Sequence, residues 1–255
     1  MARLGFGDLQ QVLRDGLTSG STLGTFIGIP GTISYELADL AGFDWVICDL
    51  EHGENEFSNV SAAVVGFTGP VITRVPSASA ENVSRVLDRG SVGVMLPRIS
   101  SKAELELALS TLDYPPRGIR GVASYNRSGS WGHDKQALSK ASPLAVVQAE
   151  TKWAADNPEE IANNPRVDAI FVGPLDLSFS LEVPRDFENP TFVAALERIL
   201  LACKASRVPV GILAVDIQKA KTYRAMGFDF IAIGSDSTSL LGAFTNQINQ
   251  LKEKQ

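Results

Sequence analysis

The sequence has few cysteines and few histidines. Its 255 residues include two of each: Cys48 and Cys203, and His52 and His133. The cysteines are far apart and no CxxC spacing occurs, which excludes a disulfide framework and a zinc site built from cysteine. Any reaction step that needs an imidazole must use His52 or His133.

Clusters of basic residues and long apolar stretches are also absent. The chain has 23 basic and 29 acidic residues, a net charge of −6, without a basic block, so we expect no nucleic-acid partner. No stretch approaches the roughly 18 apolar residues of a transmembrane helix, so we expect no membrane partner. Residues 1–8 lack the apolar core of a signal peptide, and the expected compartment is the cytoplasm.

Short apolar runs rich in Val, Ile, Leu and Phe recur along the chain, each bounded by turn residues. Such runs are typical of strands that are buried on both faces of a parallel sheet. The predicted strands are Thr22–Ile29, Asp44–Leu50, Pro70–Val75, Val92–Pro97, Leu144–Ala149, Asp168–Gly173, Val208–Ala214 and Phe228–Gly234.

Helical patterns lie between these runs. The clearest are Ser34–Ala41, Ser101–Leu112, which opens with a capping-box pattern, Pro190–Ala205, and Ile217–Met226, which Gly227 follows as a plausible C-cap. Eight strands that alternate with helices predict one (β/α)8 (TIM) barrel domain over residues 1–255. An open, doubly wound sheet is the alternative.

The segment Asp113–Ser142 is too long for a plain connection between a helix and a strand. Long loops of this kind usually serve as a lid or an interface arm, or are disordered. We expect this segment and neighbouring subunits to shape the substrate pocket. His133, which lies in it, is expected to face solvent.

Acidic residues follow two neighbouring predicted strands. Glu150 comes at the end of the fifth run and Asp176 just after the sixth. In a barrel the active site lies at the carboxyl ends of the strands, and two hard carboxylates there suit Mg²⁺ or Mn²⁺, with Co²⁺ also open. The alternative is that one acid caps a helix and the other pairs with an arginine.

His52 and Arg74 belong to the same predicted rim. His52 lies three residues after Asp49, and a histidine beside a carboxylate is a recognisable general base. Arg74 lies among apolar residues of the third run. A buried arginine needs an anionic partner, either an acid of the protein or a substrate carboxylate.

Lysine is absent from the eight runs, so a Schiff-base mechanism is disfavoured, and Lys152, two residues after Glu150, is a poor candidate for it. A metal-stabilised enolate is favoured instead. The seventh and eighth runs do not end in glycine-rich phosphate loops, and neither GxGxxG nor a Walker pattern occurs. A phosphorylated substrate or a nucleotide is therefore not expected.

Several short motifs are specific when they are taken together: GFDW at 42–45 followed by DLEH at 49–52, YPPRGIRG at 114–121, QAE at 148–150, and GPLDLS at 173–178. From about Leu23 to Leu241 the chain resembles the HpcH/HpaI aldolase family. The resemblance implies a barrel of the pyruvate/phosphoenolpyruvate superfamily. It also implies a class II, metal-dependent aldolase, similar to 4-hydroxy-2-oxoheptanedioate and 2-keto-3-deoxy-sugar-acid aldolases, that reversibly cleaves a 4-hydroxy-2-keto acid to pyruvate and an aldehyde.

The resemblance also implies the roles of individual residues. Glu150 and Asp176 match the metal ligands, His52 the base with Asp49 as its dyad partner, and Arg74 the arginine that holds pyruvate. Substrate contacts are expected from Arg74, Gln148, Gly173, Leu175, Asp176 and Leu213. The implied assembly is a homohexamer, a trimer of dimers that exchange their C-terminal helix.

Three positions depart from the pattern of many relatives: Leu50 replaces Gly, Leu175 replaces Ala, and Phe26 replaces Trp. These departures leave the aldehyde open. A CoA-ester lyase of the same superfamily, similar to citrate lyase beta or malyl-CoA lyase, and a catalytically silent ligand-binding barrel are the alternative functions.

Overall fold

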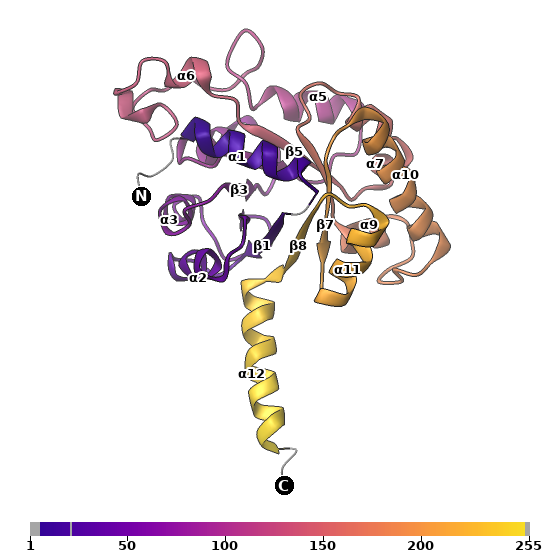
Figure 1. Cartoon of the computed structure of the whole chain (residues 1–255). Coiled ribbons are helices and arrows are strands. Elements are labelled where there is room, and N and C mark those ends of the chain that lie inside the picture. Colours follow the sequence, from indigo (N-terminus) through magenta and orange to yellow (C-terminus); the bar gives the residue numbers. More distant parts are fainter. Residues whose placement is uncertain (1–5, 21, 253–255) are drawn as a thin grey trace.

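The strands of the computed structural model, which describes residues 6–20 and 22–252, close into a parallel barrel in chain order (Figure 1). β1 pairs with both β2 and β8, so the predicted (β/α)8 barrel is confirmed and the open sheet is wrong. The strands are β1 (Leu23–Ile27), β2 (Trp45–Asp49), β3 (Val71–Arg74), β4 (Gly93–Leu96), β5 (Leu144–Ala149), β6 (Ala169–Val172), β7 (Val210–Ala214) and β8 (Phe230–Ser235).

The predicted helices are present, with half of their ends shifted by one or two residues. They are α2 (Ile33–Ala41), α5 (Lys102–Ser110), α10 (Pro190–Ser206) and α11 (Ile217–Met226). The Ser101 hydroxyl accepts a hydrogen bond from the Glu104 N–H and caps α5. Gly227 ends α11 with φ 103°, in the left-handed region that glycine adopts without strain. The remaining helices of the barrel are α3 (Asn59–Gly66), α4 (Ala80–Asp88), α7 (Lys152–Asp156), α8 (Pro158–Ala162) and α9 (Pro174–Ser180).

Alternate residues of the strands fill the inside of the barrel. In β2, Trp45 and Ile47 belong to the inner core, whereas Val46 and Cys48 pack against the helices outside. This period of two follows from the pleat of a strand. Aromatic rings dominate the inner core: Phe171 contacts the rings of Phe26 and Phe230, and Trp45 meets Phe230 edge to face.

A helix that the sequence analysis did not predict, α1 (Phe6–Thr18), closes the amino-terminal end of the barrel. Leu9, Leu13 and Leu17 are four residues apart and share one face of α1, and Leu13 and Leu17 are buried in the inner core. Apolar side chains therefore seal the end of the barrel that faces away from the predicted active site.

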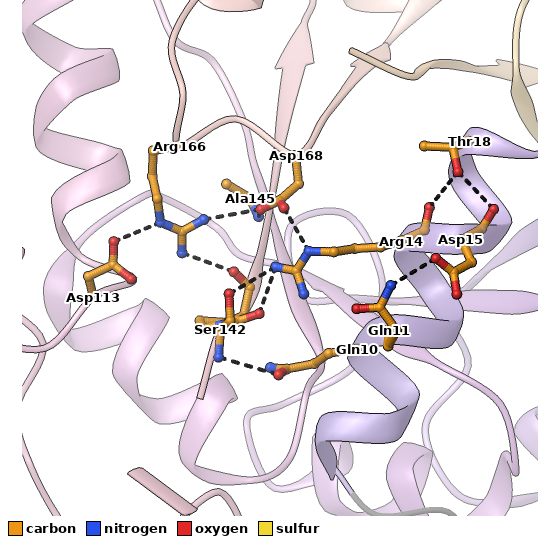
Figure 2. Close-up of polar contacts among 11 residues, drawn as sticks. Gln10, Gln11, Arg14, Asp15, Thr18, Asp113, Ser142, Ala145, Arg166 and Asp168 are labelled. Atoms are coloured by element: carbon orange, nitrogen blue, oxygen red, sulfur yellow. Dashed lines mark hydrogen bonds and ion pairs between the residues drawn. The ribbon is translucent and has the colours of Figure 1, made fainter. Parts of the chain in front are cut away.

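Polar contacts fix α1 to the strand starts (Figure 2). Arg14 donates to Asp168 at 3.0 Å and to the Ser142 carbonyl at 2.8 Å. Arg166 donates to Asp113 and to the same Asp168 carboxylate, at 2.7 and 3.1 Å. Asp113 and Ser142 are the two ends of the long segment, so this network anchors both ends beside α1.

The long segment 113–142 therefore lies at the amino-terminal end of the barrel, next to α1 and opposite the rim that bears the predicted site (Figure 1). It contains a short 3-10 helix, Ser130–Gly132, and α6 (Ala137–Lys140). The expectation that this segment shapes the substrate pocket is wrong for the chain's own pocket. The reason is topological, since a connection from a helix to the next strand returns to the start of that strand.

The last helix, α12 (Asp236–Lys252), extends away from the barrel and buries none of its described residues (Figure 1). None of the helices in the described part of the chain is long and apolar enough to cross a membrane. Residues 1–5, on which the prediction of no signal peptide depends, lie outside the described residues.

Close packing of the inner core predicts that Gly211 tolerates no side chain. A Cβ at this position would overlap the buried ring of Phe230. We expect Gly211→Ala to lower the free energy of unfolding by about 1–3 kcal/mol, measured by denaturant titration. Gly121→Ala is the matched control, because an added Cβ there meets no described atom within 4 Å. Equal effects of the two substitutions would contradict this account of the core.

Candidate active site

The inward alternation that builds the core also builds the site. After Trp45 and Ile47, the next inward residue of β2 is Asp49, and in β3 Arg74 follows Ile72 in the same way. In β5, Gln148 and Glu150 follow Leu144 and Val146. The inner layer thus changes from apolar to charged at the carboxyl ends of the strands.

Arg74 is held by a carboxylate of the neighbouring strand. Its Nε and Nη2 donate to the two Asp49 oxygens at 2.8 and 2.6 Å, a bidentate pair between residues in register on β3 and β2. Burial raises the pKa of Asp49, but the hydrogen bond and charge of Arg74 outweigh it and keep this pKa below its usual value. Both groups are therefore charged and fixed.

The expected pairing of the Asp49 carboxylate with the His52 ring stays a prediction. In this structure Asp49 contacts His52 through the backbone: its Oδ1 accepts the His52 N–H at 3.3 Å, and both of its oxygens also accept hydrogen bonds from Arg74. The carboxylate beside the imidazole is that of Glu51, whose Oε2 lies 4.0 Å from His52 Nε2. The His52 side chain is 63% exposed, so its ring faces the mouth of the barrel.

Glu51, which the sequence analysis does not name as a site residue, lies beside two arginines and His52. Its side chain is 6% exposed and lies 3.4 Å from Arg74 Nη1 and 3.3 Å from Arg98 Nε. Burial raises the pKa of Glu51, and the nearby arginines and His52 oppose this shift. In the sequence, the position of Glu51 between Asp49 and His52 could have indicated a role in the site. The alternation of side chains along β2 could not, because Glu51 follows the strand and turns back into the site.

Asn55 fixes the turn that carries Glu51 and His52. Its buried side-chain amide donates to the carbonyl of Ile27 at 2.8 Å and to that of Asp49 at 3.4 Å. The ends of β1 and β2 are thereby joined under the turn. A second contact joins the end of β1 to the start of α12. The Asp236 carboxylate accepts hydrogen bonds from the N–H groups of Gly28 and Ile29 at 2.9 and 3.0 Å.

Glu150 is a buried acid to which no cationic side chain of the described residues is bonded. It is 3% exposed and accepts hydrogen bonds from the Arg98 backbone N–H at 2.7 Å and from Gln148 Nε2 at 2.8 Å. Burial raises the pKa of Glu150 to about 7; the Arg98 N–H opposes the shift and the negative charge of Asp176 adds to it. The charge of Asp176 thus acts on Glu150, as expected for acids on adjacent strands.

Two further features suit a cation at this pair. The Oε1 atom of Gln148 is buried without a hydrogen-bond partner among the described residues. A Cβ at Gly173 would come within 2.6 Å of Glu150 Oε2, so the space beside the carboxylate depends on this glycine. Two carboxylates whose charges interact and an unpartnered amide oxygen match the oxygen ligands of Mg²⁺ or Mn²⁺.

The chain alone does not surround an ion. Among the described residues, no group of three or more His, Cys, Asp or Glu side chains could hold a metal. Asp176 is exposed on the first turn of α9, next to Leu175, whose N–H has no acceptor inside the helix. Water and substrate oxygens would have to complete the shell, as is common for Mg²⁺.

A cavity of about 510 Å³ opens beside this rim. The cavity brings together four of the predicted site residues, Asp49, His52, Arg74 and Leu213. The other predicted residues are not among those that line it: Gln148, Glu150, Gly173, Leu175 and Asp176. His133 belongs to the long segment at the other end of the barrel, far from His52 in the fold.

Comparison with known proteins supports the earlier resemblance. The model of the HpcH/HpaI aldolase/citrate lyase family matches residues 24–243. The 5-keto-4-deoxy-D-glucarate aldolase of Escherichia coli (strain K12) is 34% identical over 236 residues, which cover 91% of each chain.

Solved structures have the same fold. A HpcH/HpaI aldolase/citrate lyase family protein from Burkholderia cenocepacia J2315 superposes with a TM-score of 0.90 at 31% identity, and covers 96% of this chain and 99% of its own. An HpcH/HpaI aldolase from Desulfitobacterium hafniense DCB-2, at 24% identity and a TM-score of 0.86 over 94% and 96% of the two chains, supports the fold alone. The chain belongs to the HpcH/HpaI aldolase/citrate lyase family and is a carbon–carbon lyase.

Proposed function

We propose that the protein is a metal-dependent aldolase that reversibly cleaves a 4-hydroxy-2-keto acid to pyruvate and an aldehyde. The observation that carries this proposal is the buried Glu150 carboxylate, which lies near Asp176 and beside an unpartnered Gln148 oxygen. Such a group favours a divalent cation as its counter-charge. Family membership supports the aldolase chemistry, since the family comprises aldolases and lyases that typically use divalent metals.

Glu150 and Asp176 would hold the metal, with Mg²⁺ and Mn²⁺ as the best candidates and Co²⁺ also compatible with two carboxylates. When bound, the metal would act as a Lewis acid that polarises the keto oxygen of the substrate. The N–H of Leu175 and the backbone at Gly173 would contact the substrate carboxylate. Leu213 would border the carbon chain.

His52 would transfer the proton, and Arg74 would stabilise the negative charge that develops on the substrate. In cleavage, His52 Nε2 takes the proton of the C4 hydroxyl while the C3–C4 bond breaks, which releases the aldehyde. The electron pair of that bond passes to C3 and the keto oxygen, and Arg74 stabilises the resulting enolate. Protonation at C3 gives pyruvate. The hydrogen-bonded ion pair with Asp49 would fix the Arg74 guanidinium for this role, and the Glu51 carboxylate would stabilise the protonated ring of His52.

We also propose that the chain assembles as a homohexamer, a trimer of dimers that exchange α12. One stripe of this helix carries five exposed apolar residues, Leu240, Leu241, Phe244, Ile248 and Leu251. α2 also exposes an apolar face at Ile33, Leu37 and Leu40. An exchanged helix from a second copy would remove such surfaces from water.

The proposed base gives the first prediction for the reaction. His52→Asn should lower aldol cleavage by about 10²–10⁴-fold, because proton transfer by a placed side chain contributes about that much. The rate of pyruvate release reports the loss. His133→Asn is the matched control and should leave the rate unchanged, since His133 lies at the other end of the barrel.

The same assay tests the reaction class. With Mn²⁺ or Mg²⁺, the wild type should exchange the methyl protons of pyruvate with deuterated water, and a chelator should stop this exchange. Borohydride with pyruvate should leave the enzyme active; trapping on a lysine would overturn the proposal. Exchange without cleavage would favour the CoA-ester lyase, and no exchange the silent barrel.

Metal binding should depend on pH through Glu150. Its pKa is about 7 in the metal-free protein, so below pH 7 a proton must leave before a cation binds. The dissociation constant of Mn²⁺ should therefore rise about tenfold per pH unit below pH 7 and level off above it. Calorimetry in buffers of different ionisation heat measures the released proton. A pH-independent affinity, or unchanged binding by Glu150→Gln, would contradict the assignment.

Light scattering tests the assembly. The wild type should have six times the mass of the chain, and the double variant Leu241→Glu/Phe244→Glu should dissociate, because two charges cannot be buried in an apolar interface at low cost. Asn246→Glu, on another face of α12, should remain assembled. A monomeric wild type would refute the hexamer.

A further inference from the structure

A second cavity, of about 300 Å³, lies at the amino-terminal end of the barrel, where the strands begin. It is bordered by α1, the end of α3, the start of β3, the residues that lead into β4, and the long segment 113–142. Its walls are mostly apolar side chains: Leu9, Val64, Phe67, Val71 and Val92. Apolar walls with a few polar groups are typical of small-ligand pockets, and the proposed reaction does not use this cavity.

Two consecutive residues that line this cavity have left-handed backbones. Ser130 and Trp131 have φ angles of 51° and 55°, a conformation that is uncommon for residues with a Cβ and exceptional for bulky ones. Hydrogen bonds hold the turn: the Trp131 N–H donates to the Asn126 carbonyl at 2.8 Å, and the His133 N–H to the Ser130 carbonyl at 2.9 Å. Backbone strain of this kind is concentrated at functional sites.

The strained turn presents the Trp131 ring to solvent. Trp131 is 67% exposed, whereas Trp45 in the barrel core is 1% exposed. Leaving an indole in water forgoes the free energy of burying it, so its exposure beside a cavity calls for a reason. The buried Phe67 lines the same cavity. The cavity therefore offers two aromatic rings to a flat ligand.

Arg127 supplies a cation to this cavity. Its guanidinium carbon lies 5.9 Å from the centre of the Trp131 ring, and its stem packs where a Cβ at Gly90 would overlap it. Within residues 6–20 and 22–252, the guanidinium makes no hydrogen bond or ion pair. Asp88, whose carbonyl accepts the Arg127 N–H at 3.2 Å, directs its carboxylate to Arg120 at 2.8 Å. Open guanidinium donors favour a carboxylate, which accepts two of them at once.

We propose that this cavity binds small aromatic carboxylates. The ring of the ligand would lie against Trp131 and the apolar wall, and its carboxylate would accept hydrogen bonds from Arg127. No acidic side chain is among the described residues that line the cavity, so nothing there repels an anion. The site lies at the opposite end of the barrel from Glu150 and His52 and does not depend on the proposed function.

Three ligands of similar size test the chemical class by calorimetry. The wild type should bind benzoate. It should bind benzamide about tenfold or more weakly, because the amide lacks the charge that pairs with Arg127. It should bind cyclohexanecarboxylate about threefold or more weakly, because the saturated ring loses the aromatic contact. Equal affinities for the three ligands would overturn the proposed class.

Substitutions locate the site. Arg127→Gln should weaken benzoate binding about tenfold or more and leave benzamide unchanged, and Arg127→Lys should restore part of the preference. Arg89→Gln is the matched control, because it removes a cation next to Gly90 that does not line the cavity, and it should change neither affinity. An Arg127→Gln variant that binds benzoate as the wild type does would overturn the assignment.

Tryptophan fluorescence gives an independent readout. Benzoate should shift the emission to shorter wavelength as water leaves the Trp131 ring, and Trp131→Phe should abolish this shift. Trp153→Phe should keep it, since Trp153 does not line the cavity. Pyruvate should not displace benzoate. Displacement by pyruvate would place the aromatic acid in the proposed active site, and no binding at millimolar benzoate would mean that the cavity is closed in the assembled protein. Either result would overturn the proposal.

Discussion

The Glu150 carboxylate is buried in the barrel, and no arginine or lysine side chain in the described part of the chain is bonded to it; the rest of the site depends on this group. Removing a carboxylate from water is costly, and the cost appears here as a pKa of about 7. The surroundings relieve this cost only in part: the Arg98 N–H and the charge of Arg74 oppose the shift, while Asp176 adds a second negative charge. A divalent cation offsets both charges, and the proposed function follows from that need.

The other side of the rim balances its charges within the chain. Arg74 satisfies Asp49 through two hydrogen bonds and lies close to Glu51, which in turn contacts Arg98 and His52. This network fixes the orientation of Arg74 before any substrate arrives, which favours electrostatic stabilisation of an enolate. The charge of Arg74 also lowers the pKa of Glu150, and the site opens to solvent at His52.

Much of the fold could be predicted because the signals were local. Apolar runs with turn residues marked the strands, and Gly227 marked the end of α11. The helix α1 was missed, although Leu9, Leu13 and Leu17 lie at helical spacing, because the apolar pattern alone does not say that it closes a barrel. Segment 113–142 lies at the amino-terminal end of the barrel because it leads from α5 to the start of β5. The amino-acid composition of the segment does not indicate this position.

The candidate site was predictable to the same extent. The rule that active sites lie at strand ends brought Asp49, Arg74, Glu150 and Asp176 to one rim, where the structure has them. It could not decide which acid pairs with which base, because that depends on register: Asp49 is level with Arg74 on β3, which leaves Glu51 to the imidazole. The most direct test is anomalous diffraction from crystals grown with Mn²⁺ and pyruvate. The account predicts one manganese ion coordinated by Glu150 and Asp176, with pyruvate bound to the ion and contacting Arg74. Manganese elsewhere, or pyruvate bonded to a lysine, would contradict it.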